Sequence, residues 1–369
     1  MKFFIQNYLF IFLLKIVVSC STDHSSHESI QTANEIEYAE NLEIVEHKDY
    51  TLIHILDPET HSIEKRFLIA KKSNQKKDGY VTLEIPITSI ITLSSTHIGM
   101  LSKIDATNFI KGVSNHIYVN NPDVLKRFKQ GKVIELGDEG SNSMETIISS
   151  KAKLLMYSGF GKEFSHEKQL EQLGITCVAN YDWRENHPLG RAEWIKLYGY
   201  LTGKEKEAKS YFDQVVKEYK ATVELAKRSN LKPTVFSGNM VGEVWHLPAG
   251  ESYNAVLFRD ANSKYVYADS KGTGSLDKSF EQIFRDNQKT DYWLNPGVET
   301  KKELLDFEPR YAHFEAVKKS HVYTYTQTGN RFWELSGIEP HHVLQDLIII
   351  LHPELEDKRS LHFYKKLKE

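Results

Sequence analysis

The feature that most limits what this chain can fold into is a long helical stretch near its middle, residues 202–230. Apolar residues recur along it at helical spacing, and lysine and glutamate fill most other positions. Beyond Gly203 it contains no glycine or proline, so it predicts one helix of about 25 residues, roughly 40 Å long. We interpret it as a connector between two lobes, and a helix packed within a single core is the alternative. Its apolar face comprises Ala208, Tyr211, Phe212, Val215, Val216, Tyr219, Val223 and Ala226.

On both sides of this helix, short apolar runs alternate with helical patterns, which is typical of parallel α/β sheets. A chain of 369 residues is also too long for one hydrophobic core. The strands predicted before the connector are 51–56, 65–70, 80–87, 89–93, 132–136, 152–159 and 175–180. Those after it are 234–238, 264–269, 290–295 and 321–326, and a final helix is predicted over 339–355. The predicted fold is therefore α/β, with two Rossmann-like lobes joined by one long α-helix.

A short acidic segment occurs twice, as SMETII at 143–148 and as SFEQIF at 279–284. Each copy follows a predicted strand and a Gly/Ser-rich turn, and each precedes a further predicted strand. In this alignment the strand at 132–136 corresponds to the strand at 264–269. The chain is therefore expected to contain a repeat on the scale of a lobe.

Each copy of the segment places a serine before a glutamate at the start of a helix. Ser143 and Ser279 are predicted N-caps, and Glu145 and Glu281 lie near positive helix ends. A carboxylate in that position contributes about 0.3–1 kcal/mol to helix stability. Capping alone is thus one explanation of the repeat, and a functional pair of glutamates is the other.

The N-terminus combines Lys2, an apolar stretch and the sequence VVSC, which ends at Cys20. Polar residues break the apolar stretch before it could span a bilayer, so we predict a cleaved signal peptide. VVSC resembles a bacterial lipoprotein box, which implies that Cys20 carries lipid; an ordinary signal peptide with a chance cysteine is the alternative. Cys177 lies in a predicted buried strand, so no disulfide is expected. The expected segments are a signal peptide over 1–20, a flexible tether over 21–35, an N-terminal lobe over 36–201, the connecting helix over 202–231 and a C-terminal lobe over 232–369.

Charge and motif content exclude several classes of function. Lysine and arginine number 47 against 50 acidic residues, a formal net charge of -3 with no basic block, so no nucleic-acid partner is expected. No nucleophile elbow, P-loop or diagnostic carboxylate pair occurs, so we predict a protein that is not an enzyme. A lipid-anchored hydrolase is kept as a distant third hypothesis.

Several phrases of the sequence resemble the substrate-binding lipoproteins of ABC importers for iron complexes and cobalamin. They are TLSSTHIGML, PLGRAEWIKLYG, KPTVFSG, KGTGSLDKSFEQIF and DLIIILHPEL, together with the lipobox, the connecting helix and one glutamate per lobe. The resemblance implies a monomer with the fold of class III periplasmic binding proteins, in which a single helix limits closure of the lobes. It also implies that Glu145 and Glu281 meet arginines of a dimeric permease.

The ligand is expected beyond the carboxyl ends of the parallel strands, where doubly wound sheets bind ligands. Trp183, Trp245 and Trp333 are the aromatic residues expected to hold a large, partly apolar ligand, and Arg184 and Arg331 are expected to pair with its anionic groups. For each aromatic residue, packing within its own lobe is the alternative. The other residues placed there by the predicted strand ends are Ser95, Thr96, His97, Tyr157, Phe160, Tyr181 and His246.

The chain has 16 histidines, but their spacing predicts no resident metal. His341 and His342 are adjacent, so their side chains point in different directions, and only Asp346 follows His342 on the same helix face. Ligation of haem by His97, His246 or a tyrosine is chemically feasible, yet no sequence feature selects among them. No cofactor is predicted, because the ligand is itself expected to be a metal chelate.

The expected function is capture of a chelated metal complex, namely a ferric siderophore, haem or cobalamin, and its delivery to an ABC permease. The protein would lie in the cell envelope, anchored by lipid on the periplasmic face. The alternative is a surface-exposed lipoprotein that passes haem or cobalamin to an outer-membrane receptor. Such a carrier would keep the cleft but would have no use for the pair of glutamates.

Overall fold

The computed structural model describes residues 34–71, 75–137, 143–159, 164, 166–325, 331–355 and 358–369. The predicted signal peptide, Cys20 and Phe160 therefore lie outside the described residues. Within the described ranges, no helix is both long enough and apolar enough to cross a membrane.

The N-terminal lobe is built on a parallel sheet of five strands in the order β7-β6-β5-β8-β9. Within this sheet the first strand in the chain, β5, lies in the middle. The next two strands, β6 and β7, extend to one edge, and β8 and β9 extend to the other. β5 and β8 are thus neighbours that lead in opposite directions, which creates a topological switch point at their carboxyl ends. The bounds are β5 (Ile90–Thr92), β6 (Ile110–Val113), β7 (Ile134–Glu135), β8 (Leu154–Ser158) and β9 (Thr176–Asn180).

The C-terminal lobe has a sheet in the order β13-β10-β15-β16-β17, in which only β17 runs antiparallel. Its four parallel strands, β13-β10-β15-β16, repeat the order of β6-β5-β8-β9. Its switch point lies between β10 and β15. The apolar runs that predicted these strands are buried, as expected for parallel strands covered on both faces. The bounds are β10 (Thr234–Ser237), β13 (Lys264–Tyr265), β15 (Tyr292–Leu294), β16 (Val322–Thr324) and β17 (Lys365–Lys366).

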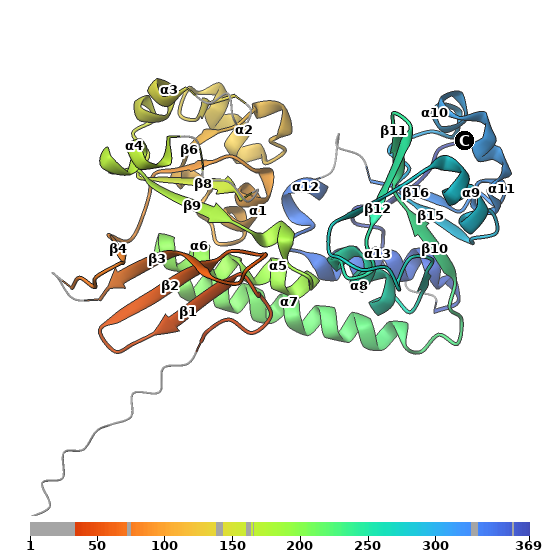
Figure 1. Cartoon of the computed structure of the whole chain (residues 1–369), viewed down its shortest axis with the longest axis horizontal. Helices are drawn as coiled ribbons and strands as arrows, with labels where there is room; N and C mark the ends of the chain where they lie inside the picture. The colour runs from red at the N-terminus through yellow and green to blue at the C-terminus, as the bar shows by residue number, and fades with distance from the viewer. Residues whose placement is uncertain are drawn as a thin grey trace, which may run out of the picture. The chain divides into compact units, whose positions relative to one another are not determined.

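A single helix, α7 (Glu205–Ala226), runs beside both lobes (Figure 1). Its 22 residues give a length of about 33 Å. It is shorter than predicted because Gly203 ends the preceding helix in the left-handed conformation, with a φ of 69°. The side chains buried from its apolar face are Ala208, Phe212, Val215, Tyr219, Thr222 and Ala226. The predicted fold class, two Rossmann-like lobes and one linking helix, is confirmed.

Two smaller sheets were not predicted as separate units. One precedes the N-terminal lobe, in the order β1-β2-β3-β4, and is antiparallel except between β3 and β4. The other is the antiparallel sheet β11-β12-β14 of the C-terminal lobe. The bounds are β1 (Leu42–Glu46), β2 (Tyr50–Leu56), β3 (Ile63–Ala70), β4 (Val81–Leu83), β11 (Asn239–Val241), β12 (Val244–Pro248) and β14 (Ser275–Lys278).

The strand correspondence predicted within the repeat is wrong in one respect. β13 pairs directly with the first strand of its lobe, as β6 does, whereas β7 is an additional edge strand. The equivalent of residues 264–269 is therefore β6, which the sequence analysis missed because IKGV is short and contains a lysine and a glycine. The two helices of the repeat, α3 (Met144–Ser149) and α9 (Phe280–Asn287), are present as predicted.

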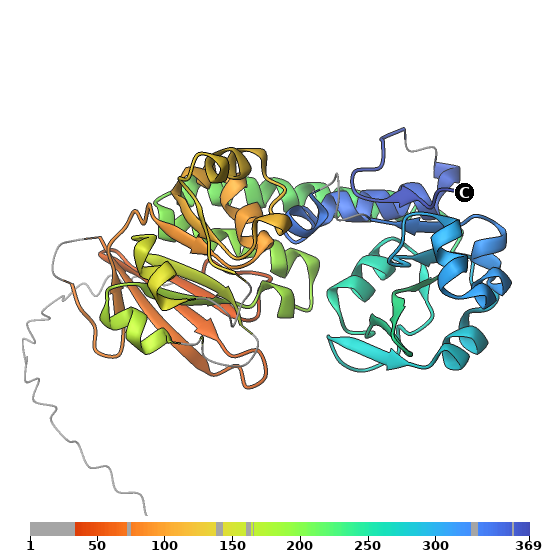
Figure 2. The same ribbon diagram turned by 90° about the horizontal axis from the view of Figure 1, so that it is seen from above.

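The remaining helices cover the sheets of the two lobes (Figures 1 and 2). α13 packs against α7. α12 follows β16 of the C-terminal lobe in the chain but packs against α1 of the N-terminal lobe. The bounds are α1 (Ser95–Lys103), α2 (Pro122–Lys129), α4 (Glu167–Gln172), α5 (Pro188–Glu193), α6 (Ile195–Thr202), α8 (Tyr253–Asp260), α10 (Lys301–Phe307), α11 (Glu315–Lys318), α12 (Phe332–Leu335) and α13 (Pro340–Leu351).

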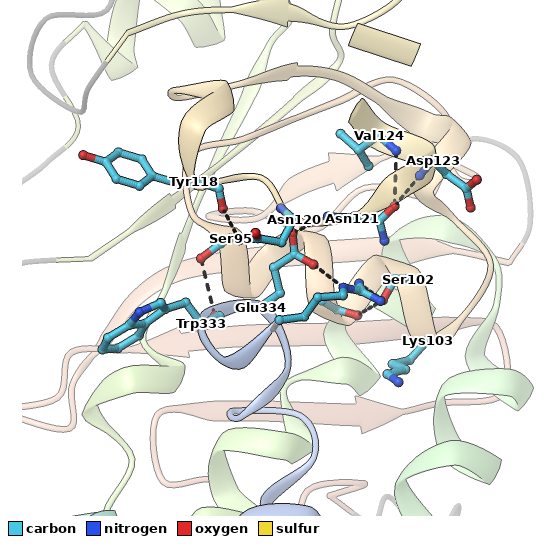
Figure 3. A network of polar contacts seen from close by, with 12 residues as sticks. Ser95, Ser102, Lys103, Tyr118, Asn120, Asn121, Asp123, Val124, Trp333 and Glu334 are labelled. Carbon is cyan, nitrogen blue, oxygen red and sulfur yellow. Dashed lines mark hydrogen bonds and ion pairs between the residues drawn. The ribbon is translucent and has the colours of Figure 1, made fainter. Parts of the chain in front are cut away.

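The contact between α1 and α12 is close and polar (Figure 3). The buried carboxylate of Glu334 accepts hydrogen bonds from the backbone N–H groups of Asn120 at 2.6 Å and Asn121 at 2.8 Å. Gly99 on α1 permits the approach, because a Cβ at that position would lie 1.7 Å from the carbonyl oxygen of Glu334. Helix α12 is therefore fastened to the N-terminal lobe although it follows the last parallel strand of the C-terminal lobe.

Candidate functional site

The larger of two adjoining cavities lies at the carboxyl ends of the parallel strands of the C-terminal lobe and has a volume of about 970 Å³. Ser237 lines it at the end of β10, Asn239 at the start of β11, Asn295 after β15, and Thr324 and Tyr325 at the end of β16. This is where an open α/β sheet is expected to bind a ligand. Such a volume lies at the upper end of the usual range for ligand sites, about 300–1,000 Å³.

A second cavity, of about 330 Å³, lies at the corresponding strand ends of the N-terminal lobe. Its wall includes Ser95 and Thr96 after β5, Ser158 at the end of β8 and Asp182 after β9. The two cavities share five lining residues, so they form one site between the lobes. The shared residues are Trp183, Tyr253, Asn254, Tyr325 and Trp333.

The structure brings six of the predicted ligand residues to this site: Ser95, Thr96, Trp183, Arg184, His246 and Trp333. The backbone of Trp333 is held by Ser95, whose hydroxyl donates a hydrogen bond to the carbonyl oxygen of Trp333 at 3.4 Å (Figure 3). Trp333 is 44% exposed, which leaves its ring accessible to a ligand. The guanidinium of Arg184 lies 5.2 Å from the ring centre of Trp183. The N-terminal lobe thus supplies an aromatic ring and a cation to the larger cavity.

Trp245 does not line the site and is corrected to a core residue. Its side chain is fully buried, 5.2 Å from the ring of Trp293, and its Nε1 donates to the carbonyl oxygen of Ser237 at 3.1 Å. Side chains alternate along β12, so Trp245 points inward while its neighbour His246 points out and lines the larger cavity. The Nδ1 of His246 lies 2.8 Å from a carboxylate oxygen of Asp277.

His97 and Tyr157 are also placed away from both cavities. His97 is fully enclosed on α1, and burial lowers its pKa to about 3, so the imidazole stays neutral. Tyr157 is buried and donates a hydrogen bond to Glu167 at 3.1 Å, while the next residue, Ser158, faces the smaller cavity. Tyr181 is likewise buried. Each of these residues lies close to the end of a correctly predicted strand, but its side chain is buried within the lobe and lines neither cavity. None of them therefore belongs to the candidate site.

Arg331 is occupied by an ion pair next to the site. Its Nε donates to a carboxylate oxygen of Glu334 at 2.6 Å, and it lines neither cavity. Arg331 therefore supports the carboxylate that fastens α12 to the N-terminal lobe. The prediction that it pairs with an anionic ligand is not supported by this placement.

The structure adds residues that sequence reasoning missed. Arg191 and Asp182 form a buried ion pair at 3.1 Å in the wall of the smaller cavity, and the Arg191 guanidinium lies 4.3 Å from the ring centre of Tyr253. Tyr253 begins α8, whose N-cap Ser252 follows a Pro-Ala-Gly turn. That cap signal could have indicated a helix start, but nothing in the sequence indicates that Tyr253 would face the other lobe. Among the described lining residues, His246, Tyr253 and Tyr325 carry ring nitrogens or phenol oxygens that can bind a metal.

The predicted docking glutamates occupy equivalent places in the two lobes. Glu145 and Glu281 are each the second residue of a helix, α3 and α9, and both are exposed. The side chain of Glu281 is 74% exposed and lies 3.6 Å from Nη1 of Arg310. The caps differ, because the hydroxyl of Ser279 accepts from the backbone N–H of Gln282 at 3.3 Å whereas Ser143 makes no side-chain cap bond within the described residues.

Comparison with known proteins gives one family match and many structural neighbours. The model of a family described as periplasmic binding protein matches residues 90–328. An uncharacterized lipoprotein of Methanocaldococcus jannaschii is 30% identical over 302 residues, which cover 78% of this chain and 71% of that protein. A periplasmic haem-binding protein from Pseudomonas aeruginosa superposes with a TM-score of 0.61 at 15% identity, covering 77% of this chain and 99% of that one. A structure described as an ABC-type Fe3+-hydroxamate transport system, from Saccharomonospora viridis, gives a TM-score of 0.57 at 16% identity, with 74% and 96% covered.

Proposed function

The chain belongs to the periplasmic binding protein family, and from this premise we propose that it captures a chelated metal complex between its lobes and delivers it to an ABC permease. The observation that carries the proposal is the joined cavity at the carboxyl ends of both parallel sheets. Capture of a ligand requires only shape, aromatic surface and charge from the cavity.

The lining suits a broad ligand with both apolar and anionic parts. Trp183, Trp333, Tyr253 and Tyr325 present aromatic surface from both lobes. Arg184 offers a cation to an anionic group, since its side chain is 28% exposed and its nearest carboxylate, of Glu59, is 3.6 Å away. Haem, ferric siderophores and cobalamin all combine such surfaces, and the named haem and hydroxamate systems among the structural neighbours make the first two the leading candidates.

We propose Glu145 and Glu281 as the permease contacts. Each is exposed on the first turn of a helix, one in each lobe, which is the arrangement that a two-lobed protein needs to dock on two permease subunits. Exposed ion pairs are worth only about 0–1 kcal/mol each, so the pair would guide orientation and allow release. Closure of the lobes is expected to be small, because one helix joins them and Glu334 ties α12 to the N-terminal lobe.

We further propose that Cys20 carries the lipid that anchors the protein in the cell envelope. Lipoproteins among the relatives support this assignment. Mass spectrometry of the membrane-extracted protein tests it: a mature chain that starts at Cys20 with an acyl-bearing mass is expected. A Cys20→Ala variant released as soluble protein would agree, whereas unchanged membrane association would contradict the assignment.

Ligand binding is tested by titrating the purified full chain with haemin, cobalamin and a panel of ferric siderophores while intrinsic tryptophan fluorescence is followed. Saturable quenching at submicromolar concentration by one class is expected. Trp183→Ala and Trp333→Ala should each weaken that binding, and Phe307→Ala should not, because Phe307 is 54% exposed and lines neither cavity. Absence of binding by every probe, or equal loss in all three variants, would refute the proposed site.

A further inference from the structure

A cluster of histidines and glutamates lies outside the ligand cavities, where three segments of the chain meet. His341 and His342 are in the first turn of α13, and Glu339 directly precedes that helix. His362 comes from the segment before β17, and Glu218 from the linking helix α7. None of these five residues lines either cavity.

The donor atoms form two groups that share His342, one with Glu339 and His362 and the other with His341 and Glu218, and within each group they lie within 4.8 Å of one another. Nδ1 of His342 and Nε2 of His362 lie 3.6 Å and 3.8 Å from the same oxygen, Oε2 of Glu339. Nε2 of His341 lies 3.4 Å from Oε2 of Glu218. Two donors on a tetrahedral zinc ion stand roughly 3.4 Å apart when each bond is about 2.05 Å, so only small shifts are needed.

Several of these donor atoms are buried without a partner. In the part of the chain that the structure describes, Nδ1 of His341, Nδ1 of His342 and Oε2 of Glu339 make no hydrogen bond. His341 is only 6% exposed, so water does not readily replace the missing partner. Buried polar groups are normally satisfied, so Nδ1 of His342 and Oε2 of Glu339, which lie 3.6 Å apart without a hydrogen bond, indicate a missing ligand.

The surrounding contacts hold the donors in place and leave a way in. Oε1 of Glu339 is taken by Lys103 at 2.5 Å and Tyr211 at 3.2 Å, which directs Oε2 toward the histidines. Asp346 accepts hydrogen bonds from the backbone N–H groups of three successive residues, including His362 at 2.7 Å. Asp346, the only partner that the sequence suggested for His342, is thus a positioning residue and not a ligand. The His362 side chain is 43% exposed, so an ion can reach the cluster from solvent.

We propose that Glu339, His342 and His362 bind one divalent transition-metal ion of the zinc type. Imidazole donors favour such an ion over calcium or magnesium, which prefer oxygen. The ion is a resident of the junction and is separate from the ligand in the cavity. It would tie the C-terminal segment to α13.

Zinc titration of the metal-stripped full chain, followed by calorimetry, tests the site. One equivalent of Zn²⁺ with submicromolar affinity is expected. His342→Ala should weaken binding more than about 100-fold and His362→Gln at least about 10-fold, since each removes a ligand. His116→Gln is the matched control, because His116 is 45% exposed, faces the carboxylate of Glu135 and lies outside the cluster.

The outcomes separate a true site from incidental binding. Weaker Zn²⁺ binding in both cluster variants, with unchanged binding in His116→Gln, supports the proposal. Zn²⁺ should then raise the unfolding temperature of the unsubstituted chain and of His116→Gln but not that of the two cluster variants. If His342→Ala does not fold, the more exposed His362→Gln decides the result. Binding weaker than about 100 µM, or binding that survives both cluster substitutions, would overturn the proposal.

Discussion

The two lobes share the order of four parallel strands, yet they contribute unequally to the ligand site. Every residue that lines the larger cavity follows α7 in the chain except Trp183 and Arg184. The C-terminal lobe carries the additional β11-β12-β14 sheet, and His246, Leu247 and Pro248 of β12 line that cavity. The common scaffold therefore places the site at the strand ends, and local additions determine which side chains line it.

The strongest test of the likeness between the lobes is removal of the glutamate from each. The double variant Glu145→Ala/Glu281→Ala is expected to lose transport while it retains ligand affinity, since neither residue lines a cavity. Uptake by cells and fluorescence titration measure the two properties. Glu207→Ala/Glu224→Ala, on the exposed face of α7, is the matched control. Lost affinity with normal docking would mean that the glutamates were assigned to the wrong role.

Two tryptophans sharpen the contrast between core and cavity. Trp245→Ala should lower the free energy of unfolding by about 3–5 kcal/mol, because it empties a fully enclosed site among aromatic rings. Trp333→Ala should cost under about 1 kcal/mol and instead weaken ligand binding about 10-fold. Denaturant unfolding and ligand titration of both variants measure this difference. Equal stability losses would show that Trp333 is a structural residue.

The enclosed histidine of the N-terminal lobe predicts a dependence of stability on pH. The pKa of His97 is about 3 in the folded protein, below its ordinary value of 6.5, so the unfolded chain binds the proton first. The contribution of the neutral imidazole to the free energy of unfolding is fully present above pH 6.5. It is lost as the pH falls toward 3, and the loss reaches about 2 kcal/mol at pH 5. Unfolding of His97→Gln at several pH values should show a smaller acid loss. The same substitution at His246 in the C-terminal lobe should leave the loss unchanged, and identical profiles for all three proteins would contradict the prediction.

The smallest expected difference concerns the two helix caps. Ser279→Ala should cost about 1 kcal/mol, because it removes the hydroxyl that accepts a hydrogen bond from the backbone N–H of Gln282 in a capping box. Ser143→Ala should cost no more than a few tenths of a kcal/mol, since its hydroxyl makes no cap bond within the described residues. Thermal unfolding measures both. A larger loss at Ser143 would show that the two copies are capped in the same way.

Local patterns predicted the scaffold well. The apolar face of α7 was read from helical spacing, and the parallel strands from runs such as IIT of β5 and YWL of β15. The family resemblance is also confirmed, because the match at 90–328 spans both lobes and the helix between them. The signal peptide and the lipid at Cys20 stay predictions.

The site was predicted less well because strand orientation is not a local property. Trp245 and His246 are adjacent, yet only the pairing of β12 with β11 and β14 determines which of them faces the core. His97 follows Ser95 and Thr96 by one or two residues, but the rotation of about 100° per residue along α1 carries its ring into the interior. In both cases the sequence located the correct region of the lobe and could not assign the face.

Local sequence patterns were sufficient to predict the two α/β lobes, the linking helix and the acidic helix starts, because these depend on periodicity and composition within a few turns of chain. They did not indicate that Tyr253 and Tyr325 share a cavity with Trp183, or that His362 meets Glu339 and His342. Such groupings join residues far apart in the chain through the packing of whole elements. No local pattern records that packing.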